Sequence, residues 1–437
     1  MSNPIFIARQ DTLENEILPA QWLSHYKLFG EESYTFQDKE IWKKLCMSRA
    51  AANDRDMHAE ALEEMLTTFS AEHTGKWMLT VYGMDAAVLE GLASMAAVAG
   101  NGTAMAAVGG NALLMHAIAN SETAMQAISR SQTAMQRVAN STTAMDAIGG
   151  SRIARDAVQA SPYYNSYIKE NDMAIAKLAV GFANLESARY SGCAGMAADS
   201  TAMTAIAASS AAMTAIAVSA VAMNAIGGNS IARDAISASS YYDANIKEND
   251  MAIAKLVVGF ANLESARYSG CAGMAADSTA MTAVAASSTA MTAVAASGVA
   301  LKAIAQAYKK TANMLQFLKA VNASDTLVKR IYSTLTNATA LFGAAQLGSQ
   351  DSVENANSWA TTSAAPNAFL ACACGYYGSS SDSVSVTYNG TVIAQKKTGT
   401  KQPGSVASTN VNAITMAPST FTENGDGYLA VQKFTAK

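Results

Sequence analysis

The chain has 437 residues and a formal net charge of −4, and 15% of its residues are charged, against about 25% in an average globular protein. So few and so evenly balanced charges give no electrostatic attraction for nucleic acid or for an anionic membrane. Half of the residues are apolar, but most of these are Ala, Met and Val, and no stretch reaches the roughly 20 strongly apolar residues of a membrane-spanning helix. We therefore expect no nucleic-acid partner and no membrane insertion.

Residues 1–80 are richer in charge and aromatic side chains than the rest of the chain, with tryptophans at Trp22, Trp42 and Trp77 and a helix-like run, DRDMHAEALEEMLTTF. The first residues lack the basic segment and apolar run of a signal peptide. We expect a protein that is made in a cytoplasm and leaves it by lysis, if at all. Residues 1–80 are predicted to be an attachment region that docks onto a larger assembly.

A repeat of ten residues fills most of the region 81–308, with the pattern [N/S/D]-x-x-A-M-x-A-[I/V]-x-x, which is clear from Asn101 onward. Its first position always holds a residue type that favours helix N-caps. Apolar residues at positions 4, 5, 7 and 8 describe one face of about two helical turns, and small pairs such as Gly-Gly end each unit. The repeat therefore predicts a stack of very short helices, the shaft, joined by tight turns.

A ten-residue helix cannot be stable alone, so the stack must be held by contacts between repeats. The methionine at position 5 is predicted to pack the shaft, together with the Ile or Val three residues later, against the next repeat and against neighbouring subunits. The predicted packing residues are Met105, Met115, Met125, Met135, Met145, Met203, Met213, Met223, Met281 and Met291.

A second, longer period of 78 residues divides part of the shaft into two copies, 152–229 and 230–307. Residues 168–206 recur at 246–284 with only two substitutions. In each copy an arginine, Arg155 or Arg233, takes the place of the methionine and a Tyr-Tyr pair follows, and we expect these insertions to end one stack and start the next. Duplication of a whole module lengthens a spacer without redesign, whereas few active sites would tolerate it.

The pattern changes after the repeats. Residues 309–346 show helical spacing, and 347–437 are predicted to be a linker and a small antiparallel β-sandwich that forms the tip. Asn389-Gly390 between alternating apolar and polar residues is a strong hairpin signal. The fold class expected is mainly α: a helical N-terminal region, the stacked short-helix shaft, and a small C-terminal antiparallel β-sandwich.

Residue types that carry catalysis or bind metals are sparse. None of the four histidines, at positions 25, 58, 73 and 116, stands at metal-ligand spacing with another ligand type. The five cysteines are too scattered for a disulfide scaffold and are predicted to be small buried apolar residues. No phosphate-binding or nucleophile motif occurs in a strand–turn–helix context. We expect no catalytic residue, no cofactor and no metal.

Two duplicated polar groups need an explanation. Glu170 and Asp172, with their copies Glu248 and Asp250, stand near the start of a predicted helix, where negative charge favours the helix dipole. A duplicated cation site is the weaker alternative for these carboxylates. For the arginine of each copy we favour a salt bridge between repeats or subunits over a ligand site.

The decapeptide arrays, the near-verbatim duplication, the aromatic N-terminal segment and the small C-terminal β module together resemble virion proteins of tailed bacteriophages, in the class of tail fibres, whiskers and baseplate-associated proteins. The resemblance implies a structural homotrimer, made in the host cytoplasm and located in the virion tail. It also implies an N-terminus attached to other tail or baseplate proteins and a C-terminal tip that meets a host glycan or protein. Many fibre shafts are β-structured, so the helical repeats leave the position on the virion open.

Three other functions compete with this interpretation. A bacterial surface adhesin or filament subunit would require a secretion signal or anchor. An ice-binding solenoid would require the same Thr in every repeat, but Gln126, Asp146 and Asn224 interrupt the series. A glycan-cleaving tip would require paired carboxylates, and its only candidates, Asp382, Glu423 and Asp426, lie in turn-like sequence.

Overall fold

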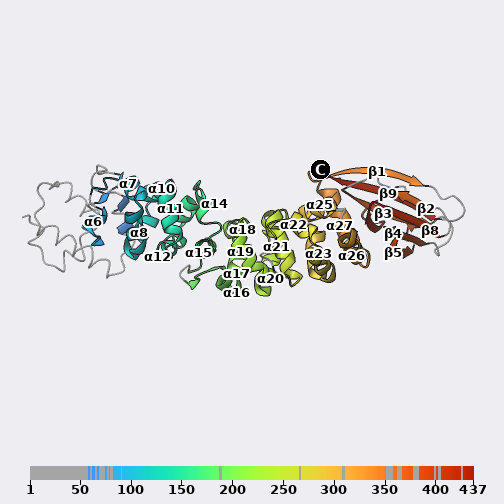
Figure 1. Cartoon of the computed structure of the whole chain (residues 1–437), viewed down its shortest axis with the longest axis horizontal. Helices are drawn as coiled ribbons and strands as arrows, with labels where there is room; N and C mark the ends of the chain where they lie inside the picture. The colour runs from blue at the N-terminus through green and yellow to red at the C-terminus, as the bar shows by residue number, and fades with distance from the viewer. Residues whose placement is uncertain are drawn as a thin grey trace, which may run out of the picture. The chain divides into compact units, whose positions relative to one another are not determined.

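The computed structural model confirms the predicted fold class, since it is mainly α with a C-terminal β part (Figure 1). The chain forms two compact units, 1–222 and 223–437, each described below by itself. Trp22, Trp42 and Trp77 of the predicted attachment region lie outside the described residues. The structure describes residues 58–59, 62–63, 66–67, 74–75, 78, 82–89, 91–186, 189–264, 267–307, 311–350, 358–361, 367–376, 383–397, 400–401, 405–424 and 427–437.

The first unit is a succession of short helices. Their bounds are α6 Ala86–Leu89, α7 Met95–Gly100, α8 Gly102–Gly110, α9 Ala112–Ala119, α10 Glu122–Ser129, α11 Gln132–Ala139, α12 Thr142–Gly150, α13 Arg152–Gln159, α14 Tyr164–Tyr167, α15 Asp172–Phe182, α16 Cys193–Ala198, α17 Ser200–Ala207 and α18 Ser210–Ala217. The next helix, α19 (Ala220–Gly227), spans the boundary between the units.

Each decapeptide makes one helix because its first residue caps it. In α12 the Oγ of Ser141 accepts a hydrogen bond from the backbone N–H of Ala144 at 3.1 Å. Consecutive helices then turn sharply, by 102° between α8 and α9 and by 103° between α17 and α18. Three such bends nearly complete a turn, so helices three apart pack together, as α8 does with α11, α9 with α12 and α10 with α13.

The capping side chain also bonds the preceding turn of the stack. It donates a hydrogen bond to a backbone carbonyl 32 residues earlier, at the C-terminal end of the helix below, where carbonyls lack partners in their own helix. The pairs are Ser131 to Ala99 at 2.7 Å, Ser141 to Gly109 at 2.6 Å, Ser151 to Ala119 at 2.6 Å and Asn171 to Ala139 at 3.0 Å. One side chain therefore caps the N-terminus of its own helix and bonds the C-terminal end of a helix in the turn before.

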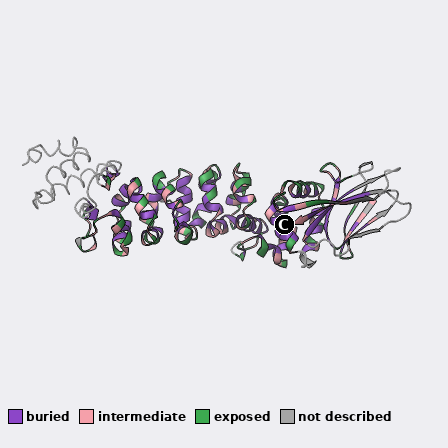
Figure 2. Cartoon of the chain, turned by 90° about the horizontal axis from the view of Figure 1, so that it is seen from above, coloured by how far each residue is buried: buried purple, intermediate pink, exposed green. Residues whose placement is uncertain are grey.

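The core of the stack is closed within one chain. Position 4 and the position-8 Ile or Val are fully buried, and so are the ten predicted packing methionines, with Met291 the most exposed at 2% (Figure 2). Position 9 is buried in most repeats, whereas position 7 is mostly half-exposed and was wrongly assigned to the buried face. These methionines are thus unavailable for the packing between subunits that was predicted for them.

The predicted joint at the arginine does not interrupt the stack, because α13, which carries Arg155, packs on α10 like the helices before it. The regular succession of decapeptides stops later, in the connection between α15 and α16. Asn184 there adopts a positive φ of 58°, and its copy Asn262 one of 57°. The insertion that sets the 78-residue period is therefore this loop and not the arginine repeat.

The second unit continues with helices and ends in two sheets. Its helices are α20 Ser230–Ala238, the π-helical turn η4 Asp243–Lys247, α21 Asp250–Phe260, α22 Cys271–Ala276, α23 Ser278–Ala286, α24 Ser288–Ala295, α25 Gly298–Gln306, α26 Thr311–Asn322 and α27 Asp325–Asn337. Its strands are β1 Phe342–Gln350, β2 Ser358–Thr361, β3 Ala368–Tyr376, β4 Ser383–Tyr388, β5 Thr391–Lys397, β6 Thr400–Lys401, β7 Val411–Met416, β8 Ser419–Asn424 and β9 Gly427–Ala436.

The strands pair antiparallel, except for β3 with β6. One sheet has the order β1-β9-β3-β6, with β7 also on β3, and the other has the order β2-β8-β4-β5. The predicted hairpin is confirmed: β4 pairs with β5 around Asn389 and Gly390, whose φ angles of 48° and 77° suit a tight hairpin turn. Strand β1 begins at Phe342, inside the segment 309–346 that was predicted to be helical.

Helices α26 and α27 pack on the β part and fix it to the helical repeats of the second unit. The Asn322 side chain accepts a hydrogen bond from the backbone N–H of Ile414 in β7 and donates one to the carbonyl of the same residue. The Tyr332 hydroxyl donates to the carbonyl of Val406 at 2.8 Å. The helical segment and the β part therefore share one core.

Among the described residues, no single helix has the length and apolarity to cross a membrane. In three cases, two successive helices pass this test if they are counted as one, but the two helices meet at an angle of 96–103°.

Helices α12 and α15 approach so closely that only glycine fits at position 181. A Cβ added to Gly181 would overlap the carbonyl of Gly149, and one added to Gly259 in the second unit would overlap that of Gly227. The small-residue positions of the repeat are thus used for direct contact between helix backbones.

Replacing Ser141 by Ala should lower the free energy of unfolding by about 1–3 kcal/mol, because both the cap and the bond to the Gly109 carbonyl are lost. Ser141→Asn is the matched control, since Asn171 makes both bonds with an amide. Urea unfolding followed by far-UV circular dichroism measures both variants. An alanine variant as stable as the asparagine variant would contradict the dual role.

Replacing Gly181 by Ala should destabilise the first unit by about 1–3 kcal/mol or more, because the methyl group meets backbone that cannot rotate away. Gly150→Ala is the control, as a Cβ at the end of α12 meets nothing within 4 Å. That variant should be neutral or more stable by about 0.5–1 kcal/mol. Thermal melts that rank the two variants in the opposite order would refute the close approach.

Candidate functional site

Each 78-residue copy buries a lysine within its apolar helices. Lys177 in α15 is 1% exposed, and its Nζ forms an ion pair with the Asp146 carboxylate of α12. In the second copy Lys255 is 2% exposed and donates to the side-chain oxygen of Asn224. Asn224 stands 78 residues after Asp146, so the copies differ in the charge of the lysine's partner.

The burial of these lysines was not predicted from the sequence, although the sequence contains one signal for it. Lysine stands in the middle of DMAIAKLAVGF, which is otherwise apolar after its first residue and is repeated with one change. A buried ammonium must be hydrogen-bonded or paired, which the partners from α12 and α19 provide. The arrangement holds two helices together and leaves the lysine inaccessible to a substrate.

Among the described residues, the two repeat arginines form no salt bridge between repeats of the chain. Arg155 is 7% exposed, donates to the carbonyl of Gly149 at 2.8 Å and lies 5.4 Å from the ring centre of Phe182. Arg233 repeats this arrangement with the carbonyl of Gly227 and the Phe260 ring. A backbone carbonyl and an aromatic face thus replace a carboxylate, and burial lowers the pKa of both arginines.

The duplicated carboxylates act on helices other than the one they begin. Glu170 accepts from the N–H of Ala220, and Glu248 from the N–H of Gly298, each 50 residues further on. Asp172 accepts from the N–H of Cys193 at 2.7 Å, and Asp250 repeats this bond to Cys271. Asp172 and Asp250 lie in the first turn of α15 and α21, as the dipole argument predicted, and the bonds to other helices come in addition.

Three further residues repeat as a cluster beside the inserted loop. The Arg189 guanidinium lies 2.9 Å from the Asp199 carboxylate and 5.7 Å from the ring centre of Tyr190. The N–H of Ala202, which Asp199 caps, is the main cause that lowers the pKa of Asp199. Burial is the main cause that raises the pKa of Tyr190 to about 12, and the hydrogen bond to the Asp199 carboxylate is the second cause. Arg267, Tyr268 and Asp277 form the same cluster in the second unit.

The cysteines were predicted to be small buried residues, and those that the structure describes are buried. Cys193, Cys271 and Cys372 are buried, which confirms the prediction for these three. Burial, followed by the nearby aspartate, raises the pKa of Cys193 and Cys271. Cys46 and the side chain of Cys374 lie outside the described residues. A protonated, buried thiol is a poor nucleophile.

No metal-binding group assembles in the part of the chain that is described. No group of three or more His, Cys, Asp or Glu residues there could hold a metal. His58 is buried and stacks near Tyr82, while positions 25 and 73 lie outside the described residues. Of the carboxylates weighed for cleavage, the backbone of Glu423 lies in β8, opposite Val384, and positions 382 and 426 are not described.

Four of the repeat threonines bond their own helices. The hydroxyls of Thr204, Thr214, Thr282 and Thr292 donate to the carbonyl four residues earlier, at 2.7–2.9 Å, and the four side chains are exposed. The helix therefore accounts for these hydroxyl bonds without a ligand.

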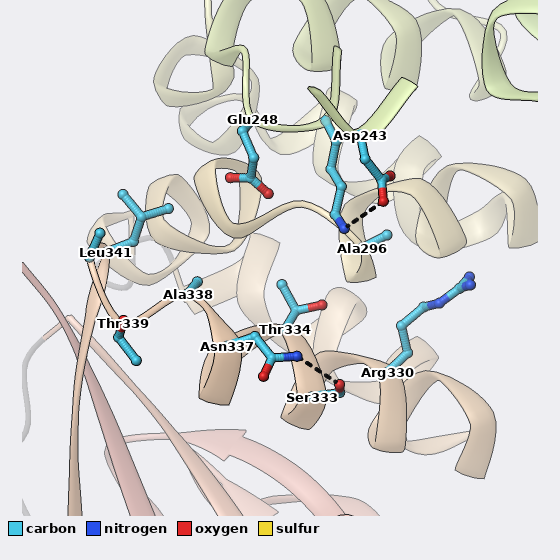
Figure 3. Close-up of a pocket in the computed structure, with 12 residues that line it drawn as sticks. Asp243, Glu248, Ala296, Arg330, Ser333, Thr334, Asn337, Ala338, Thr339 and Leu341 are labelled. Carbon is cyan, nitrogen blue, oxygen red and sulfur yellow. Dashed lines mark hydrogen bonds and ion pairs between the residues drawn. The ribbon is translucent and has the colours of Figure 1, made fainter. Parts of the chain in front are cut away.

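A polar pocket of about 630 Å³ lies in the second unit between η4 and α27 (Figure 3). Asp243 and Lys247 form an ion pair at 3.6 Å on one side, and Glu248 beside them accepts the N–H of Gly298. Asn337 and Arg330 of α27 line the opposite side. The twelve lining residues include no cysteine or histidine, so the pocket offers neither a thiol nor an imidazole base.

No known protein family and no curated protein matches the chain. The geometry of the described residues therefore carries the functional argument, together with the resemblance in repeat style.

Replacing Asp146 by Ala should destabilise the first unit by about 3–5 kcal/mol, because the buried Lys177 ammonium loses its counter-ion. Asp146→Asn copies the arrangement of the second unit and should cost clearly less. Urea midpoints of the two variants decide the matter. Equal losses would mean that the carboxylate charge contributes nothing.

Acid should weaken the repeats through Asp199 and Asp277, whose pKa values are lowered in the folded chain. Their contribution is complete above the ordinary aspartate pKa of about 3.9 and is lost as the pH falls through the lower, folded value. The double variant Asp199→Asn, Asp277→Asn keeps both caps without a titrating group. Melting between about pH 6 and pH 2 should therefore fall less for the variant. Parallel curves would contradict the assignment.

Proposed function

We propose that the chain is a structural component of a phage tail, a fibre or fibre-like appendage. Its N-terminal region would dock to the virion, and its C-terminal β part would meet the host surface. In this proposal it is no enzyme and needs no cofactor. Its partners are further copies of itself and other tail or baseplate proteins.

The observation that carries the proposal is the double use of the capping residue. Because Ser131, Ser141 and Ser151 each bond the turn before, successive turns of this array are held by the same local contacts. A stack of this kind gains length by duplication without a new core. The 78-residue duplication is what such a spacer would accumulate.

The buried polar groups support the same proposal. The buried Lys177 and Arg155, and the exposed Asp172, would be the first candidates for chemistry in an apolar chain, yet each is held by a contact between helices. Buried charges used in this way orient packing rather than substrates. A structural role accounts for all three without a ligand.

Immunogold electron microscopy tests the proposal. Antibodies against residues 1–57 and against the β part should label tails of particles released from cells that make the chain, and mass spectrometry should find the chain in those particles. Label on intact, unlysed cells and none on particles would favour the surface-adhesin alternative instead.

The host-contact role of the β part has its own test. The purified full chain should compete with particles for adsorption to host cells, and an antibody against the β part should block this competition. An antibody against residues 1–57 is the matched control and should leave it unchanged. Competition that only the control antibody blocks would move the host contact to the other end of the chain.

A further inference from the structure

Among the described strands, five form the borders of the two sheets, namely β1, β2, β5, β6 and β7, and all but β1 are protected against pairing with another chain, β6 by its length of only two residues. Strand β7 is covered by α26 and α27, and the Asn322 side chain bonds its backbone. Strand β5 carries Lys396 and Lys397 in its sequence, and β2 has only four residues. Short length, lysines and cover are the usual means by which natural sheets avoid edge-to-edge association.

Strand β1 is the exception. It has nine residues, FGAAQLGSQ, without a charge or a proline, and among the described strands it pairs with β9 alone. Figure 1 shows it along the outer border of its sheet, beside β9. One irregularity, at Leu347, leaves Phe342–Gln346 in regular register with β9. About half of the N–H and C=O groups of this stretch point away from β9, toward the open border.

The side chains of this stretch suit the approach of another strand. Ala344 and Ala345 are exposed and, as neighbours in a strand, lie on opposite faces of the sheet. Both are small, so neither blocks a strand that comes alongside.

We propose that the β1 border pairs with a strand of a second copy of this chain. Identical chains bring identical charges together, so a border used between copies must be free of them, and β1 meets this condition. Pairing of β1 with the partner's β1 closes a dimer. The inference rests on the proposed function, which names further copies of the chain as partners, and deepens it by assigning the surface through which they meet.

The test compares the mass of the full chain in solution with that of the double variant Ala344→Lys, Ala345→Lys, by size-exclusion chromatography with light scattering. The unaltered chain should contain at least two copies. The variant should have the mass of one, because lysines on both faces repel at the border. Val392→Lys is the matched control, since it adds the same charge at a 52% exposed position of β5. It should keep the mass of the unaltered chain.

Far-UV circular dichroism and thermal melting should show that the double variant is folded, because both substituted positions are exposed. If it is not, the pair Ala344→Glu, Ala345→Glu replaces it with the same expected loss of association. An unaltered chain that stays single at all concentrations would overturn the inference, and so would a folded charged variant that keeps the full mass. A chain that stays single would also remove further copies from the proposed partners, whereas the labelling of particles tests the location in the tail separately.

Discussion

The repeats depend on one side chain that makes two hydrogen bonds. A Ser such as Ser141 satisfies an N–H at the start of its own helix and a carbonyl at the end of a helix in the preceding turn. Helix ends are the weak points of eight-residue helices, because half of their backbone groups have no partner inside them. By joining a start to an end 32 residues away, the cap makes short helices stable only as a stack. It also fixes the number of helices in a turn.

The same constraint explains the composition. Helices that meet through carbonyls and caps lie close together, which admits Ala and Gly at the contacts and forbids a Cβ at Gly181. Flexible Met fills the remaining space, with Met105 and its equivalents at the centre. The buried charges, Lys177 and Arg155, then satisfy groups between neighbouring helices. Polar and apolar features of the repeat thus serve one purpose, the contact between successive turns.

For function, the closed core separates two roles that the sequence joined. Because the repeat methionines are buried inside one chain, they cannot also hold copies together, and any association must use another surface. The β part offers such a surface in β1, whose backbone border is long and uncharged. A repeated spacer that is complete in one chain and a β part that associates would together suit the structural role proposed.

The sequence alone determined the local structure. Asn101 and the Ser, Asp and Asn residues that follow it in register fixed where helices begin, and Asn389-Gly390 fixed a hairpin, because caps and turns depend on residues close in the chain. It could not determine which helix a side chain reaches. The Asp146–Lys177 pair, the bond from Asp172 to the start of α16 and the use of Met213 within one chain depend on the bend of about 100° between helices, which only the tertiary structure decided.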